Sequence, residues 1–251
     1  MNTPRRQRIG AAFSAAQSYD RHAGVQRTVA HALAARIAAL DLPAGPRILE
    51  IGCGTGFLTE ALIEQKVVGE WLITDLAPTM VARCRDRIGD APARHFAVLD
   101  GEYGPRPEGA PFDLICSSLA LQWFDDIAAA ADRLRGWLAP GGHLIFTTLA
   151  AATFAEWRAA HEALGLTAGT PQFPPAAAFG PESAAERHVE HHASAREFLH
   201  ALKAIGAGTA AAGHRPLRPA DLRRVIARFD EAGSAVTYEV VTCYYRTEGA
   251  A

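Results

Sequence analysis

Three glycines and two acidic residues are the chemically most informative feature of this chain. Gly52, Gly54 and Gly56 follow an apolar run at the spacing G-x-G-x-G, Glu50 precedes the first glycine by two residues, and Asp75 ends the next apolar run. Glycine permits a tight turn and close approach of the backbone to a ligand. A carboxylate at the end of a second strand accepts hydrogen bonds from ribose hydroxyls. Since carboxylates suit a neutral diol better than a phosphate, the pattern predicts a nucleoside site.

The glycine spacing argues against a dinucleotide cofactor. The dinucleotide fingerprint G-x-G-x-x-G has its third glycine where this chain has Phe57. A nicotinamide-dependent dehydrogenase would also need a hydride-transfer partner, and we find none in the sequence. Taken alone, the three glycines could form an ordinary strand-to-helix turn. The acidic Asp75 at the end of the next strand favours a ligand site over this alternative.

Further candidates follow the later predicted strands, because ligands of open α/β sheets lie across the carboxyl ends of the strands. Asp100 would accept a hydrogen bond from an adenine amino group, and Met80 would form a soft apolar wall. A solvated loop aspartate and plain core packing are the alternatives for these two residues. The predicted cofactor-binding set is Tyr19, Glu50, Gly52, Cys53, Gly54, Gly56, Asp75, Leu76, Met80, Asp100, Gly101 and Ser117.

Alternating strands and helices must position these residues. Period-two and period-3.6 patterns with capping and breaker signals predict an α/β fold with a mainly parallel sheet. We expect strands at 48–51, 71–75, 94–99, 112–117, 143–148 and 235–245, and helices at 22–39, 57–66, 78–87, 127–138, 154–164, 194–205 and 219–231. Pro140-Gly141-Gly142 is expected to break the chain before the fifth strand.

One domain of four segments is expected for a chain of 251 residues. These are a helical cap (1–40), a cofactor-binding core (45–149), a proline-rich insertion that forms a lid or substrate wall (150–185), and C-terminal strands and helices (186–251).

Composition excludes several classes of protein. A formal net charge of −2 with 21% charged residues gives no global basic field for nucleic acid or an anionic membrane. No apolar run approaches the roughly 18 residues of a spanning helix. The four cysteines form no C-x-x-C pair, so we expect reduced thiols, a cytoplasmic location and no metal site.

Four motifs together resemble one family. They are A-F-S-x-A-x-S-Y-D-x-H-A-x-x-Q (12–26), S-S-L-A-L-Q-W-F (117–124), F-T-T-L (146–149) and F-L-x-x-L-K-x-I-G-A (198–207). With the glycine turn they are similar to the malonyl-acyl-carrier-protein O-methyltransferases of biotin synthesis, which are class I S-adenosylmethionine-dependent methyltransferases. The resemblance runs from about Ile9 to Tyr245 and is weakest between 165 and 192.

This resemblance implies a Rossmann-like fold with a seven-stranded, mostly parallel sheet and helices on both faces. It implies S-adenosylmethionine as methyl donor, with S-adenosylhomocysteine as product. The acceptor would be the free carboxylate of a malonyl thioester on acyl carrier protein or coenzyme A, and its methyl ester would prime pimeloyl synthesis.

The acceptor carboxylate needs hydrogen-bond donors, and the motif segments supply Tyr19, His22, Gln122, Trp123, Lys203 and Arg215. We expect Tyr19, Gln122, Trp123 and Lys203 to form the catalytic set. The alternatives are mere helix capping by Asp20 for the Tyr19–His22 segment and a solvated position for Lys203.

An acidic carrier protein would be guided by a local basic face. Arg223, Arg224 and Arg228 offer one, and Arg5, Arg6 and Arg8 offer another; a solvated helix face is the alternative. Two rival functions stay open, namely methylation of another small carboxylic acid or quinone precursor, and noncatalytic binding of S-adenosylmethionine.

Overall fold

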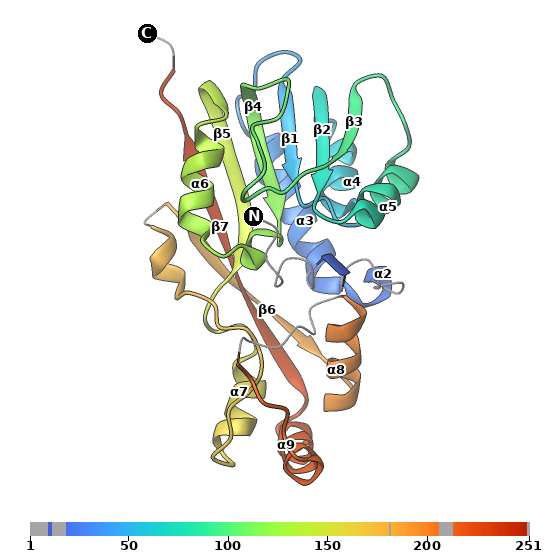
Figure 1. The fold of residues 1–251 in the computed structure, drawn as a ribbon, viewed down its shortest axis with the longest axis vertical. Helices are drawn as coiled ribbons and strands as arrows, with labels where there is room; N and C mark the ends of the chain where they lie inside the picture. The colour runs from blue at the N-terminus through green and yellow to red at the C-terminus, as the bar shows by residue number, and fades with distance from the viewer. Residues whose placement is uncertain (1–9, 12–18, 181, 206–212, 250–251) are drawn as a thin grey trace.

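Seven strands form one twisted sheet at the centre of the molecule (Figure 1). The structure is a computed structural model, and it describes residues 10–11, 19–180, 182–205 and 213–249. The strand order is β3-β2-β1-β4-β5-β7-β6. Strands β1 to β5 are parallel, and β7 is antiparallel to both β5 and β6. The strands are β1 (Arg47–Ile51), β2 (Glu70–Asp75), β3 (Arg94–Val98), β4 (Phe112–Ser118), β5 (Leu138–Leu149), β6 (Ala184–His191) and β7 (Ala235–Arg246).

Helices cover both faces of the parallel part, as expected for right-handed crossovers between parallel strands. The helices are α2 (Tyr19–His22), α3 (Gly24–Ala38), α4 (Phe57–Glu64), α5 (Pro78–Ile88), α6 (Ile127–Arg135), α7 (Ala155–Glu162), α8 (Ala195–Ala204) and α9 (Pro219–Glu231), with 3-10 turns η1 (Leu121–Trp123) and η2 (Ala176–Phe179). No helix in the described ranges is long and apolar enough to cross a membrane.

The parallel strands are buried on both faces, which explains their nearly continuous apolar sequences. In β1, Ile48 packs with α3 and α4, while its neighbour Leu49 packs with α6 on the opposite face. Leu114 and Ile115 alternate in the same way in β4. The packed sheet therefore holds the carboxyl ends of β1, β2 and β4 rigidly, and these ends lie side by side.

A second cluster of buried aromatic side chains lies below this core, where β6 and β7 run down toward α7, α8 and α9 (Figure 1). Trp157 of α7 contacts Phe198 of α8 and Phe229 of α9 at ring-centroid distances of 5.7 and 5.3 Å. Phe154 adds a perpendicular contact to Tyr238 of β7. The three C-terminal helices are thus fixed to the long antiparallel strands rather than to the parallel ones.

The predicted α/β class and the mostly parallel seven-stranded sheet are confirmed. The breaker at Pro140-Gly141-Gly142 is wrong, because β5 begins at Leu138 and passes through these residues with a shift in register against β4. A bulge of this kind absorbs residues that cannot follow a regular ladder. Strand β6 has no predicted counterpart, since its sequence A-A-E-R-H-V-E-H is polar and it pairs only with β7.

Candidate active site

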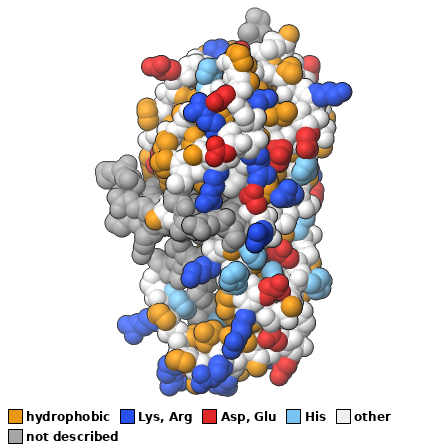
Figure 2. Space-filling view, turned by 90° about the vertical axis from the view of Figure 1, so that its right-hand side faces the viewer, with side chains coloured by type: hydrophobic (Ala, Val, Ile, Leu, Met, Phe, Trp, Pro, Cys, Tyr) orange, Lys and Arg blue, Asp and Glu red, His pale blue; other side chains and the backbone are white. Residues whose placement is uncertain are grey.

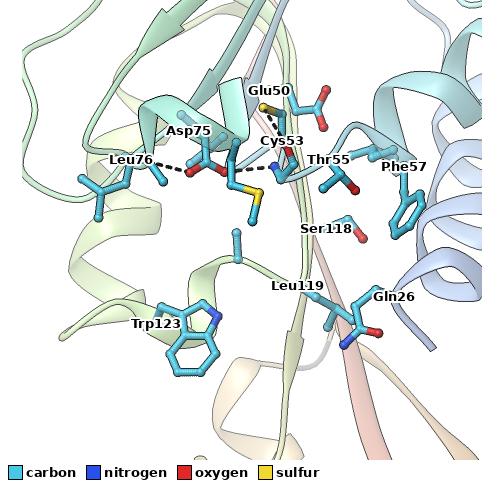
Figure 3. Close-up of a pocket in the computed structure, with 18 of the residues that line it drawn as sticks. Gln26, Glu50, Cys53, Thr55, Phe57, Asp75, Leu76, Ser118, Leu119 and Trp123 are labelled. Carbon is cyan, nitrogen blue, oxygen red and sulfur yellow. Dashed lines mark hydrogen bonds between the residues drawn. The ribbon is translucent and has the colours of Figure 1, made fainter. Parts of the chain in front are cut away.

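The glycine turn after β1 forms one wall of a cavity at the carboxyl ends of β1, β2 and β4 (Figure 3). The cavity holds about 970 Å³ of empty space, part of it open to solvent. Gly52 and Gly54 have positive φ angles of 72° and 53°. A Cβ at Gly52 would lie 2.4 Å from the Cβ of Ala120, whereas one at Gly54 would enter open space. The turn therefore brings bare backbone to the cavity.

Asp75 lies at the end of β2 and is hydrogen-bonded to the glycine turn. Its Oδ2 accepts the backbone N–H of Gly54 at 2.9 Å, and its Oδ1 accepts that of Ala77 at 2.8 Å. A carboxylate has about four acceptor positions, so Asp75 keeps capacity for hydroxyl groups of a ligand. Burial raises its pKa, and backbone hydrogen bonds from Ala77, Gly54 and Leu76 oppose that shift.

Glu50 lies deeper in the same wall and is only 1% exposed. Its Oε2 accepts the hydroxyl of Thr59 at 2.6 Å. Burial raises the pKa of Glu50 to about 7; the Thr59 hydrogen bond lowers it and the negative charge of Asp75 raises it further. Glu50 is thus a carboxyl group that changes charge near neutral pH.

The remaining walls are largely apolar, and none of the described residues in them has a positively charged side chain. Leu76, Met80, Leu99, Phe57 and Phe124 are among the lining residues. Within the described part of the chain, no Lys, Arg or His lines this cavity, while Glu50 and Asp75 do. Opposite charges attract more strongly in a partly dry site, so the cavity favours a ligand with hydroxyl groups, an apolar ring and positive charge.

The short helix α2 is hydrogen-bonded to the glycine turn. The Thr55 hydroxyl donates to Oδ1 of Asp20 at 2.7 Å, and Arg87 of α5 donates to Oδ2 of the same carboxylate. Arg87 also donates to Glu60 at 3.1 Å and lies over the ring of Phe57, 4.6 Å from its centroid. These contacts place α2 beside the cavity.

A second cavity, with about 520 Å³ of empty space that is partly open to solvent, adjoins the first. Gln26, Leu119 and Trp123 line both, so these three residues form the junction. Pro171 and Phe173 line it from the proline-rich insertion, and the other lining residues are Gln122, Leu149, Phe154, Ile205 and Tyr238. Among the described residues this lining also lacks Lys, Arg and His.

Most of the predicted cofactor-binding residues come together in the first cavity. Its lining includes Glu50, Gly52, Cys53, Gly54, Asp75, Leu76, Met80 and Gly101. Trp123, predicted for catalysis, lines both cavities, and Gln122 lines the second. The Nε2 of Gln122 donates to the Leu119 carbonyl at 2.6 Å, which fixes its orientation and leaves the buried Oε1 without a partner among the described residues.

Three predicted cofactor-binding residues lie outside the lining, each for a local reason. The Ser117 hydroxyl is buried and donates to the carbonyl of Ile51 at 2.7 Å, while Ser118 lines the cavity instead. Asp100 turns its Oδ1 to the backbone N–H groups of Glu102 and Tyr103. Gly56 is the N-cap residue just before α4, where a Cβ would lie 3.0 Å from Cys84 Sγ.

Lys203, also predicted for catalysis, is exposed on α8 and lines neither cavity. Leu202, its neighbour, is buried in the aromatic cluster, so the helix turns Lys203 outward. Of the remaining proposed donors, Arg215 is exposed before α9, and His22 contacts the ring of His200 of α8 at 5.3 Å. Tyr19 begins α2, and its side chain is outside the described part.

Gln26 is the most informative lining residue that the sequence reasoning missed. It lies on the buried stripe of α3, four residues before Ala30 and seven before Leu33. A polar residue on an apolar stripe was the available signal, because that face otherwise carries buried apolar side chains.

Comparisons with known proteins agree with this geometry. Residues 49–144 match the family model described as a methyltransferase domain. Among solved structures, the Bacillus halodurans protein BH2331 superposes with a TM-score of 0.59 at 13% identity, over 87% of this chain and 98% of that one. A Haemonchus contortus phosphoethanolamine N-methyltransferase gives 0.53 at 15% identity, over 95% and 58%. These two likenesses support the fold alone.

Two curated relatives are much closer in sequence. The biotin biosynthesis bifunctional protein BioCD of Bordetella avium is 48% identical over 90% of this chain, which spans 49% of that protein's length. The malonyl-[acyl-carrier protein] O-methyltransferase of Magnetococcus marinus is 39% identical over 95% of this chain and 92% of its own. Since the likeness to the Magnetococcus protein extends over nearly the full length of both, this chain belongs to the malonyl-[acyl-carrier protein] O-methyltransferase family.

Proposed function

We propose that this protein transfers the methyl group of S-adenosylmethionine to the free carboxylate of a malonyl thioester carried by acyl carrier protein. The observation that carries the proposal is the pair of adjoining cavities, joined at Gln26, Leu119 and Trp123. The first is lined by two carboxylates, and no described residue that lines the second is charged. The first has the character of a cofactor site and the second that of an acceptor site. The family membership supplies the class of acceptor.

The residues of the first cavity fit S-adenosylmethionine. Asp75 retains acceptor positions for ribose hydroxyls, and Leu76, Met80 and Leu99 offer an apolar slot for adenine. The carboxylates suit the positive charge of the cofactor, and the open space at Gly54 leaves room beside the backbone. When bound, the cofactor supplies an electrophilic methyl group on a sulfonium sulfur.

The acceptor needs no general base. A malonyl carboxylate is already ionised near pH 7, so its oxygen lone pair forms the new O–CH3 bond as the C–S bond breaks. The negative and positive charges cancel, and no proton moves. The protein's part is to align the oxygen with the methyl carbon, for which effective molarities are worth about 7–11 kcal/mol, and to exclude water.

The insertion supplies part of the acceptor wall in this proposal. Pro171 and Phe173 line the second cavity from the 150–185 segment, and Phe154 lies at its start. We assign this segment the role of a cover that keeps the acceptor cavity dry, because apolar walls strengthen the alignment of a charged group with its few polar partners.

The carrier protein is expected to dock near the basic end of the molecule. Figure 2 shows Lys and Arg side chains gathered at the lower end, where Figure 1 places α9. Arg224 and Arg228 make ion pairs with Asp221 and Glu231 of the same helix at 3.8 and 3.6 Å, while Arg223 is exposed. The alternative patch of Arg5, Arg6 and Arg8 is outside the described residues.

The test is transfer of labelled methyl from S-adenosylmethionine to malonyl-acyl carrier protein, measured beside malonyl-coenzyme A, acetyl-acyl carrier protein and trans-aconitate. We expect label on the malonyl thioesters and none on the acetyl thioester, which lacks the free carboxylate. Label on trans-aconitate alone would replace the acceptor with another small carboxylic acid. Cofactor binding without any labelling would contradict the enzymatic function.

A further inference from the structure

We propose that the Gln26 side chain holds the acceptor carboxylate at the junction of the two cavities, and this inference rests on the proposed function. Gln26 is placed by α3 so that it lines both cavities. Figure 3 shows its carboxamide beside Leu119, on the other side of the cavity from Asp75. The methyl group must cross from one cavity to the other at this junction.

The hydrogen-bonding state of Gln26 supports the assignment. It is half-buried, and no described residue is hydrogen-bonded to its side chain. A carboxamide has two N–H donors, and leaving such donors without partners in a site that closes over a ligand would cost free energy. A carboxylate oxygen would satisfy them. Gln122 is less suited to this task, because its Nε2 is engaged by Leu119 and its free atom is an acceptor.

The chemistry of the reaction favours a neutral donor over a cation at this point. As the O–CH3 bond forms, the carboxylate loses its negative charge, so an Arg or Lys partner would stabilise the starting state more than the transition state. A neutral amide can align the oxygen while stabilising the charged starting state less than a cation would. In agreement, no described residue that lines either cavity is Lys, Arg or His.

Two substitutions separate this role from a structural one. Gln26→Met keeps the length and removes the donors, and Gln26→Glu keeps the shape and adds a negative charge. The control is His31→Gln, at an exposed position on the same helix. Each variant is measured for kcat and KM with malonyl-acyl carrier protein, for Kd of S-adenosylhomocysteine, and for inhibition by the neutral methyl ester product.

We expect Gln26→Met to lower kcat/KM roughly 10- to 150-fold, the range of a hydrogen bond to a charged group, with the Kd of S-adenosylhomocysteine within about threefold of the wild-type value. Gln26→Glu should lower kcat/KM further, through charge repulsion, while inhibition by the neutral ester changes much less. Unchanged kcat/KM in Gln26→Met, or parallel loss of malonyl, ester and S-adenosylhomocysteine binding, would overturn the inference. A wild-type enzyme that does not label malonyl thioesters would overturn the proposed function as well.

Discussion

Removing the charge of Glu50 should change how the stability of this protein depends on pH. Glu50 is 1% exposed, and its pKa is raised to about 7 from an ordinary value of 4.5. Between these values the folded state binds a proton that the unfolded state releases, so the free energy of unfolding falls as pH rises through this window. Each pKa unit corresponds to about 1.4 kcal/mol, and the loss amounts to about 3 kcal/mol by pH 8.

Glu50→Gln removes this titration while keeping the shape of the side chain. The amide oxygen can still accept the Thr59 hydroxyl, and any cost of placing the amide N–H groups is independent of pH. The expected result is therefore a change in slope: the variant gains about 3 kcal/mol relative to the wild type between pH 4.5 and pH 8.

The assay is urea unfolding at a series of pH values, with the free energy of unfolding obtained at each. Glu64→Gln serves as the control, because Glu64 ends α4 with 58% of its side chain exposed and surface changes are usually within about 0.5 kcal/mol. Parallel curves for the wild type and Glu50→Gln across this window would refute the reasoning, since they would mean that Glu50 titrates alike in both states.

Three further outcomes test other parts of the site. Asp75→Ala should weaken S-adenosylmethionine binding by about 1–3 kcal/mol in calorimetry, whereas the exposed Asp86→Ala should not; equal affinities would remove Asp75 from the ribose site. Gly52→Ala should lower the melting temperature and abolish cofactor binding, because its Cβ would lie 2.4 Å from that of Ala120 at a φ of 72°; a stable, binding-competent variant would contradict this. Arg223→Glu should raise KM for malonyl-acyl carrier protein and leave KM for malonyl-coenzyme A unchanged, and equal effects on both would place the docking face elsewhere.

The cofactor half of the site could be predicted because it is encoded locally. The glycine turn and Asp75 each follow a strand whose apolar sequence is recognisable, and parallel strands bring their carboxyl ends to one edge. The predicted residues that lie outside the cavity lining, such as Ser117, are one position away in the sequence from residues that line it. Successive residues of a strand point to opposite faces, so a one-residue error exchanges the cavity for the core.

The acceptor half could not be predicted in the same way, because its lining comes from segments far apart in the sequence. Gln26 of α3, Pro171 and Phe173 of the insertion, and Tyr238 of β7 meet only in the folded chain. Their convergence depends on tertiary contacts such as the packing of α7 to α9 against β7. The strand that pairs with β7 at the edge of the sheet, β6, has a polar sequence that gives no strand signal. The position of Lys203 could not be predicted for the same reason. Its sequence motif is recognisable, but packing of Phe198 and Leu202 in the aromatic cluster decides which face of α8 is buried, and Lys203 lies on the exposed face.

The contacts of α2 connect these two halves. Asp20 accepts hydrogen bonds from Thr55 of the glycine turn and from Arg87 of α5, so α2 is held to the wall of the cofactor cavity. Gln26 follows six residues later, at the start of α3, and faces the acceptor cavity. A carboxylate at the junction can therefore be aligned by the same short segment that is anchored beside the cofactor. In the proposed reaction, alignment of the two reactants is the main task of the protein, and the contacts of α2 and α3 place Gln26 where it can serve that task.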